Sequence, residues 1–180
     1  MCCFGSAITF LQNQKLARVQ KLYSHYLSQL ILDKRLKHLL HITPFLLFDG
    51  NCAEAMTFYQ KCLGGELTLT KLGDTPMKDQ FPKEKHNRII NAQLKSGAIE
   101  ISATDWMASP TLEPKQGNTF SIFVVGGTYD ELKVVFDKLA EGADKDKITF
   151  MELHDMPFGT YGQFTDKYGV PWIFKGEKKE

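Results

Sequence analysis

From position 42 onward, apolar residues follow two patterns, and these patterns come in the same order twice. Short runs rich in β-branched and aromatic residues predict strands, whereas two longer stretches with an apolar residue every three or four positions predict helices. The helices are expected at 52–63 and 129–141. The strands are expected at 42–48, 67–72, 89–94, 99–103, 120–125, 148–153, 161–165 and 170–174. The pattern therefore predicts one strand, one helix and three more strands in each half.

Both predicted helices have residues typical of helix ends. Asn51 and Thr128 stand where an N-cap accepts hydrogen bonds from the first backbone N–H groups. Gly64 and Gly142 follow the last apolar positions, where a residue that tolerates positive φ ends a helix. The turn 166–169, which ends in glycine, is expected to join the last two strands as a hairpin.

The repeat predicts an α+β fold made of two βαβββ modules, at residues 42–106 and 117–176. The polar stretch between them contains Pro110 and Pro114 and is expected to be a linker. A single module would leave the apolar face of a small sheet exposed, so the two modules should close on each other. The sheets are then expected to curl around a shared cavity, which is the default position for a ligand.

Residues 1–41 differ in character from the rest of the chain. Apolar residues recur there near helical spacing among basic ones, with few acids, which predicts one amphipathic helix. Five interpretations of this N-terminal extension stay open. These interpretations are a helix docked on the domain, a poorly ordered tail, a membrane-surface helix, a transit peptide, and a segment acylated at Cys2 and Cys3.

Charge and cysteine content narrow the possible partners. Lys and Arg number 22 and Asp and Glu number 21, so the charge balance does not predict nucleic acid as a partner. No apolar run approaches the ~20 residues that span a bilayer, so no integral membrane span is expected. The four cysteines lack the density of a secreted disulfide framework. Reduced thiols and a cytoplasmic location are therefore expected.

Three segments carry a resemblance to a known family. They are ITPFLLFDGNCAEAMTFYQKCLGGEL at 42–67, GNTFSIFV at 117–124 and FGTYGQFTDKYGVPWIF at 158–174. Together they resemble PhnB-like proteins, a branch of the glyoxalase, bleomycin-resistance and extradiol-dioxygenase group, also called the vicinal oxygen chelate superfamily. The resemblance covers about residues 42–176 and implies paired βαβββ modules. Proteins of this family often form homodimers, so a homodimer is expected here.

The resemblance also implies where metal-dependent relatives hold a metal: on four side chains, one from the first and one from the last strand of each module. In this sequence those positions fall at or within a residue of Pro44, Glu100, Phe120 and Ile173. Only Glu100 offers a ligand atom, and the usual catalytic site needs at least three protein donors. No metal ligands are therefore assigned and no cofactor is expected, while weak binding of a divalent metal stays open.

Glu100 is the candidate catalytic residue. Its neighbours Ile99 and Ile101 are expected to point to the opposite side of the strand. A carboxylate buried in the cavity would act as a general base or a ligand anchor, whereas one that faces solvent would have no such role. Six further residues are candidates for ligand binding: Asp105, Trp106, His154, Phe158, Tyr161 and Trp172. For these six, a core or solvated position is the alternative.

The sequence therefore predicts a small-molecule binding protein of the PhnB-like type, with a largely apolar, aromatic-lined cavity and an incomplete metal site. The expected ligand packs against Phe158, Tyr161 and Trp172. The alternative is a metal-assisted lyase, isomerase or dioxygenase-like enzyme of the same superfamily, with Glu100 as base or ligand and a metal held by donors such as His154. A third possibility is a structural or regulatory dimer that interacts through its N-terminal helix.

Overall fold

The computed structural model describes residues 42–107, 114, 115, 117 and 119–179, together with Lys21 and Ser24. The chain divides into two units, Met1–Ile42 and Thr43–Glu180. Lys21 and Ser24 are helical, and the rest of the predicted N-terminal helix lies outside the described residues. The interpretation of residues 1–41 therefore stays a prediction, and the second unit holds the fold and the candidate site.

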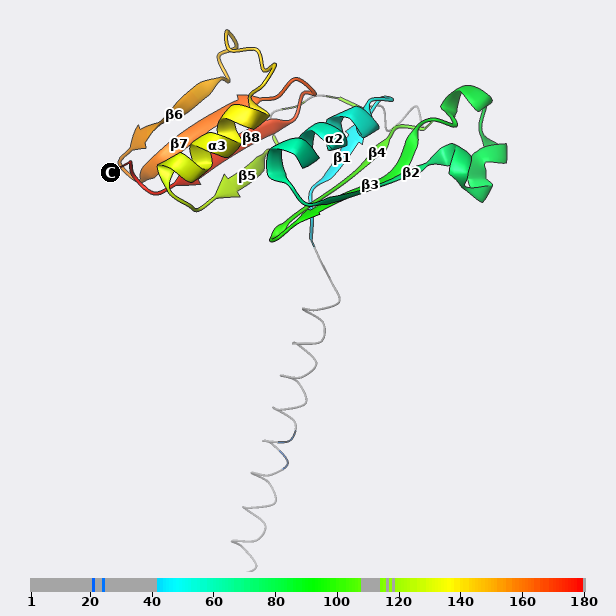
Figure 1. Cartoon of the computed structure of the whole chain (residues 1–180), viewed down its shortest axis with the longest axis horizontal. Helices are drawn as coiled ribbons and strands as arrows, with labels where there is room; N and C mark the ends of the chain where they lie inside the picture. Colours follow the sequence, from blue (N-terminus) through cyan, green and yellow to red (C-terminus); the bar gives the residue numbers. More distant parts are fainter. Residues whose placement is uncertain are drawn as a thin grey trace, which may run out of the picture. The chain divides into compact units, whose positions relative to one another are not determined.

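The second unit begins with a four-stranded sheet covered by one helix (Figure 1). Its elements are β1 (Phe45–Phe48), α2 (Cys52–Leu63), β2 (Glu66–Lys71), β3 (Ile89–Ser96) and β4 (Ile99–Asp105). The strands lie in the order β1-β4-β3-β2, with β1 parallel to β4 and the other pairs antiparallel. Three short 3-10 helices fill the connection between β2 and β3: η1 (Leu72–Asp74), η2 (Pro76–Gln80) and η3 (Lys83–Lys85). We call this sheet the first sheet.

The second sheet repeats this plan. Its elements are β5 (Ile122–Val125), α3 (Tyr129–Leu139), β6 (Met151–Met156), β7 (Gly159–Thr165) and β8 (Pro171–Gly176). The strand order β5-β8-β7-β6, with β5 parallel to β8, corresponds to that of the first sheet. The predicted α+β fold of two βαβββ modules is therefore confirmed. No helix among the described residues is long and apolar enough to cross a membrane.

Three strands, β1, β5 and β6, begin two or three residues later than the apolar pattern predicts. β1 starts at Phe45 rather than at position 42, and Ile42 is exposed. β6 starts at Met151 rather than at position 148, because backbone turns occupy 145–149 and leave the Ile148 side chain 99% exposed. β5 likewise starts at Ile122 rather than at Phe120. Apolar character alone does not show whether a residue pairs with a neighbouring strand, so exposed apolar residues extended the predicted strands too far.

The two helices begin in different ways. Thr128 caps α3 as predicted: its hydroxyl accepts a hydrogen bond from the Glu131 backbone N–H, and the Glu131 carboxylate accepts one from the Thr128 backbone N–H. Asn51 occupies the predicted position before α2, but its side chain makes no capping bond. Instead the Asp105 carboxylate, at the end of β4, accepts from the Cys52 backbone N–H at 3.0 Å. The cap of α2 thus comes from a residue distant in sequence.

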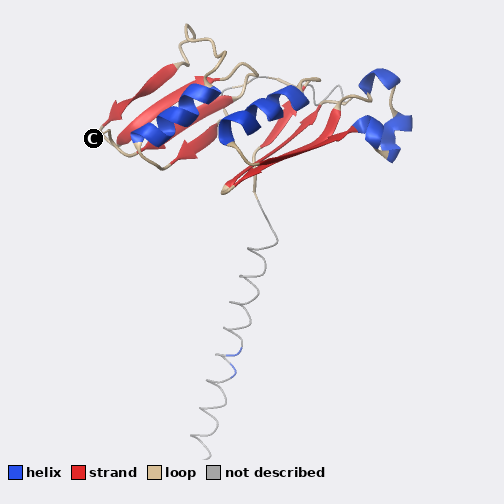
Figure 2. Ribbon diagram, viewed as in Figure 1, coloured by secondary structure: helices blue, strands red, loops and turns tan. Residues whose placement is uncertain are grey.

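Each helix covers one face of its sheet, as the blue helices against the red strands show in Figure 2. Strand residues that point toward the helices are buried, for example Leu46 and Ala103 in the first sheet and Phe164 and Phe174 in the second. Residues on the opposite faces are exposed or half-buried, and Phe45 of β1 is 62% exposed. The described core therefore lies between the helices and the sheets.

A buried carboxylate joins the two modules. Asp166, in the turn between β7 and β8, is 5% exposed. Its Oδ2 atom accepts hydrogen bonds from the Tyr59 hydroxyl of α2 and from the Trp172 indole N–H of β8, both at 2.8 Å. Its Oδ1 atom accepts from the backbone N–H groups of Tyr168 and Val170. These donors satisfy the buried charge, and burial together with the Asp166 charge raises the pKa of Tyr59 above its usual range.

Removing this carboxylate should destabilise the junction of the modules. Asp166→Ala leaves the Tyr59 hydroxyl and the Trp172 indole N–H buried without their acceptor, and each such group costs about 1–3 kcal/mol. We expect the free energy of unfolding, measured by urea denaturation, to fall by about 3 kcal/mol or more. Asp79→Ala, at an exposed aspartate of η2, is the control and should change it by less than about 0.5 kcal/mol. Equal stabilities of the two variants would contradict this role.

Candidate functional site

The faces of the two sheets that point away from the helices are here called the open faces. On the open face of the second sheet, cross-strand partners form two rows. The first row contains His154, Tyr161, Lys175 and Val125, and the second contains Met151, Gln163, Ile173 and Phe123. Neighbouring strands lie about 4.8 Å apart, so each row is roughly 15 Å long. This face is wide enough for a small organic molecule.

Three rings meet on this open face. The Tyr161 ring lies between the rings of His154 and Phe158, at centroid distances of 6.4 and 6.1 Å, and both contacts are edge-to-face. This geometry is favourable, because the positive edge of one ring meets the negative face of the other. Phe158 is 54% exposed and Tyr161 is half-buried. The cluster therefore presents an aromatic surface on the side of the sheet opposite α3.

The turn between β6 and β7 positions Phe158. The next residue, Gly159, adopts a φ of 120°, and a Cβ atom there would lie 2.3 Å from the Gly176 carbonyl oxygen. Only glycine accommodates both the positive φ and this close approach. From β8, Lys175 places its ammonium group 5.3 Å from the centroid of the Phe158 ring, within the range of a cation–π contact. Backbone geometry and the lysine thus hold the ring over the open face.

Hydrogen bonds orient two of the polar side chains on this face. The Tyr161 hydroxyl donates to Gln163 Oε1 at 2.8 Å. His154 Nδ1 lies 2.8 Å from the Glu152 carbonyl oxygen, which only accepts, so Nδ1 carries a proton and Nε2 is the acceptor of the neutral ring. The sequence pattern places His154 in a loop, but the structure places it within β6. It therefore stands in a fixed cross-strand position beside Tyr161.

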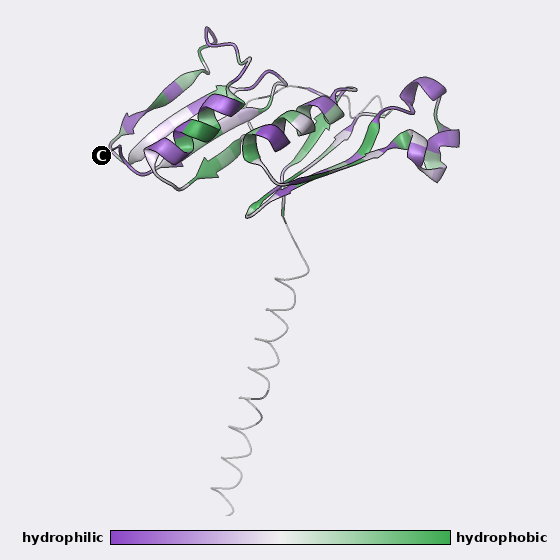
Figure 3. Cartoon of the chain, viewed as in Figure 1, coloured by the Kyte–Doolittle hydropathy of each residue, from purple (hydrophilic) through white to green (hydrophobic). Residues whose placement is uncertain are grey.

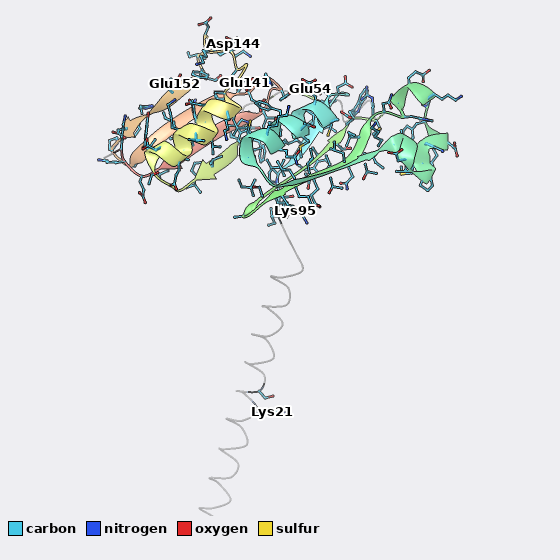
Figure 4. All side chains as sticks on the ribbon, viewed as in Figure 1. Lys21, Glu54, Lys95, Glu141, Asp144 and Glu152 are labelled. Atoms are coloured by element: carbon cyan, nitrogen blue, oxygen red, sulfur yellow. The ribbon has the colours of Figure 1, made fainter. Side chains whose placement is uncertain are left out.

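Glu100 lies on the open face of the first sheet. Its side chain is 25% exposed, and its Oε1 atom lies 3.9 Å from Lys95 Nζ. The same oxygen accepts a hydrogen bond from the Gln93 side-chain amide at 2.7 Å. Figure 4 labels Lys95 on the strand that pairs with β4. Glu100 thus matches neither predicted alternative fully. It is neither buried in a cavity nor fully in solvent, because it lies half-buried on the open face with two polar partners.

Asp105 lies on the opposite side of the first sheet, toward α2. It is 2% exposed, and its Oδ2 atom accepts from the Ile89 backbone N–H at 2.8 Å. Its other oxygen caps α2 through Cys52. Burial, with the nearby Asp105 charge, raises the pKa of the Cys52 thiol to about 12, so this thiol is protonated at neutral pH. The position of Asp105 favours a structural role in holding β3, β4 and α2 together.

The two tryptophans also lie away from the aromatic cluster of the second sheet. Trp172 is 1% exposed, packs edge-to-face on Tyr59 of α2 and donates to Asp166. Trp106 follows β4 and is half-buried, with Lys85 Nζ 5.5 Å from its ring centroid. Trp172 is therefore a core residue on the helix side of its strand.

Comparisons with known proteins agree with this architecture. A family model described as 3-demethylubiquinone-9 3-methyltransferase matches residues 40–174. The chain belongs to this PhnB-like family. Protein YjdN of Escherichia coli strain K12 is 27% identical over 145 residues, which cover 77% of this chain and 97% of that protein. The predicted resemblance is therefore confirmed.

Two solved structures resemble the PhnB-like chain across both modules. Protein PA1353 from Pseudomonas aeruginosa is 31% identical, with a TM-score of 0.65, and the match covers 78% of this chain and 99% of that one. A PhnB protein from Bacillus cereus is 25% identical, with a TM-score of 0.57, and the match covers 76% of this chain and 99% of that one. These matches support the two-module fold.

In this PhnB-like chain, the structure brings together three of the seven candidate site residues: His154, Phe158 and Tyr161. Glu100 lies on the open face of the other sheet. Their functional roles stay predictions. The sequence reasoning missed Lys175 and Gln163, which share the open face with this cluster. Their signal was strand alternation, because each is a polar position next to a buried aromatic residue of the terminal hairpin, Phe164 or Phe174.

The described residues of the PhnB-like chain do not match the four-position metal site of metal-dependent relatives. Of the four positions only Glu100 carries a donor atom, because Ile173 has an apolar side chain and because Pro44 and Phe120, which also lack ligand atoms, precede β1 and β5. The part of the chain that the structure describes contains no group of three or more His, Cys, Asp or Glu side chains that could hold a metal ion. The described residues at these four positions therefore do not fit the metal site of those relatives.

A cleft of about 420 Å³ lies at the junction of the two modules. Leu46 and Phe48 of β1 line one part of it, and Phe120, Tyr168 and Pro171 line another. None of the seven candidate residues is among its described lining residues. This junction cleft is therefore the competing position for a ligand, and an experiment on the PhnB-like site has to separate it from the open face.

Proposed function

We propose that this PhnB-like chain binds a small aromatic molecule on the open face of the second sheet. The observation that carries the proposal is the cluster of Phe158, Tyr161 and His154, whose rings pack edge to face on the side opposite α3. The ligand ring lies against Tyr161 and Phe158. Its polar groups lie toward Gln163 and the Nε2 atom of His154.

The composition of this face supports a planar, largely apolar ligand. Phe158 and Phe123 are each 54% exposed, and covering apolar surface contributes about 25 cal/mol per Å². Half-buried polar groups, the Tyr161 hydroxyl and the Gln163 amide, stand beside these rings. Ligand sites typically combine apolar walls with a few polar groups that fix the orientation of the ligand. The open face has both.

We also propose that the chain forms a homodimer that covers the open faces. Phe45 is 62% and Val125 66% exposed, and the edge strand β5 is hydrophobic along its length in Figure 3. Exposed apolar surface of this kind marks interaction sites. A second copy would bring the same faces and turn the open face into a cavity. Sedimentation that finds only a 20.5 kDa species at every concentration would contradict this part.

The enzymatic alternative has less support from the geometry. It requires Glu100 and a donor such as His154 to act on one substrate. In a single chain these side chains lie on the open faces of different sheets. Glu100 is also already paired with Gln93 and Lys95. Binding, which needs only the aromatic cluster, is therefore the function that the geometry supports better.

A fluorescent probe tests the position of the site. N-Phenyl-1-naphthylamine, a neutral aromatic molecule, should bind the wild-type chain and shift its emission to the blue, because its rings leave water. Phe158→Ala should weaken binding about tenfold, or about 1.4 kcal/mol, since it removes one aromatic wall. Phe120→Ala is the matched control, because Phe120 is 58% exposed but lines the junction cleft. It should leave the affinity unchanged.

The pair of variants gives a clear decision. If Phe120→Ala weakens binding and Phe158→Ala does not, the probe occupies the junction cleft and the proposal is wrong. Equal affinities in all three proteins would also contradict it. Far-ultraviolet circular dichroism of each variant shows that an altered affinity does not come from unfolding.

A further inference from the structure

We infer that the ligand of the second sheet is an aromatic acid whose carboxylate is held by Lys175. The inference rests on the proposed function and specifies the chemical class of the ligand. Lys175 and Tyr161 are direct cross-strand partners, and His154 is the next member of the same row. The Lys175 ammonium group also lies 5.3 Å from the centroid of the Phe158 ring. A cation therefore borders the aromatic surface.

No acidic side chain in the described part of the chain forms an ion pair with this cation. The cross-strand row that contains Lys175 carries no carboxylate. The two acids that flank His154 are engaged elsewhere. Glu152 Oε1 lies 3.8 Å from Lys145 Nζ, and the Asp155 carboxylate accepts from the Lys179 backbone N–H at 3.1 Å. The open face of the second sheet is therefore locally positive.

The spacing of the row fits a planar anion. Lys175 and His154 are separated by two strand spacings, about 10 Å, which a molecule of one or two aromatic rings spans. A ring packed on Tyr161 directs an acidic substituent toward the ammonium group of Lys175. A charge-assisted hydrogen bond there is stronger than one between neutral groups. At the other end of the row, His154 Nε2 is placed to accept from a hydroxyl group.

A second basic surface is a weaker candidate for the anion. A cleft of about 730 Å³ lies between α2 and α3. Its lining includes three lysines and two glutamates: Lys61, Lys138, Lys167, Glu54 and Glu141. The two glutamates, labelled in Figure 4, offset the positive charge. Lys167 Nζ lies 3.9 Å from the centroid of the Phe58 ring, so this cleft supplies a matched control: a lysine beside an aromatic ring on another surface.

Two probes that differ by one anionic group test the inference. 1-Anilinonaphthalene-8-sulfonate is N-phenyl-1-naphthylamine with an added sulfonate, which stands in for the carboxylate. In fluorescence titrations, the wild-type chain should bind the sulfonate about tenfold more tightly than the neutral probe. Lys175→Gln should remove this preference, so that the variant binds the two probes with similar affinities. Lys175→Arg, which keeps the charge, and Lys167→Gln, the matched control, should both keep the preference.

The outcomes separate this inference from the proposed function. If the wild-type chain shows no preference for the sulfonate, or if the preference survives Lys175→Gln, the aromatic-acid assignment is overturned even when the neutral probe binds at Phe158. A preference lost only in Lys167→Gln assigns the anion to the cleft between α2 and α3 and overturns it as well. If Lys175→Gln loses its affinity for both probes, the role of Lys175 is not limited to holding the anionic group through its charge. If Phe158→Ala does not change the affinity for the neutral probe, the proposed function itself is overturned.

Discussion

The arrangement of the two modules depends on the buried carboxylate of Asp166. This carboxylate accepts hydrogen bonds from the Tyr59 hydroxyl of the first module and from the Trp172 indole N–H of the second. Removing a partner from a buried charge is costly, so this contact strongly favours one position of α2 against the terminal hairpin. The rings of Tyr59, Tyr168 and Trp172 pack edge to face around it. Because the helix sides of both sheets form the described core, a ligand of the size proposed has its best surface on the open faces.

The two open faces differ in chemistry although their backbones follow the same plan. In the first sheet, Gln93, Lys95 and Glu100 form a polar group of paired side chains. On the open face of the second sheet, the Phe158 and Tyr161 rings contact each other, and Lys175 lies beside Phe158. The open face of the first sheet therefore combines these polar residues with the exposed Phe45 ring, whereas the second carries a cluster of rings, and for this reason we propose the second sheet as the site for an aromatic molecule. A dimer would place such surfaces out of water.

Periodicity predicts the strands and helices well, because burial under a helix requires apolar residues at alternate strand positions. It cannot predict contacts between residues far apart in sequence. Asn51 has the right type and place for the cap of α2, but Asp105 makes the bond. Trp172 has the right type for a ligand platform, but Asp166 and α2 bury it. The sequence pattern does not identify Lys175 as a site residue, because the charged end of a surface lysine is ordinarily solvated.

Backbone amide chemical shifts, recorded while 1-anilinonaphthalene-8-sulfonate is added to the ¹⁵N-labelled protein, test the central claim most directly. Each amide reports on its own surroundings, so the ligand position is read without altering any side chain. We expect the largest changes at Tyr161, Gln163 and Lys175 and in the turn that carries Phe158. Largest changes along the cleft between α2 and α3, or around Phe120 in the junction cleft, would contradict the open face of the second sheet as the binding site.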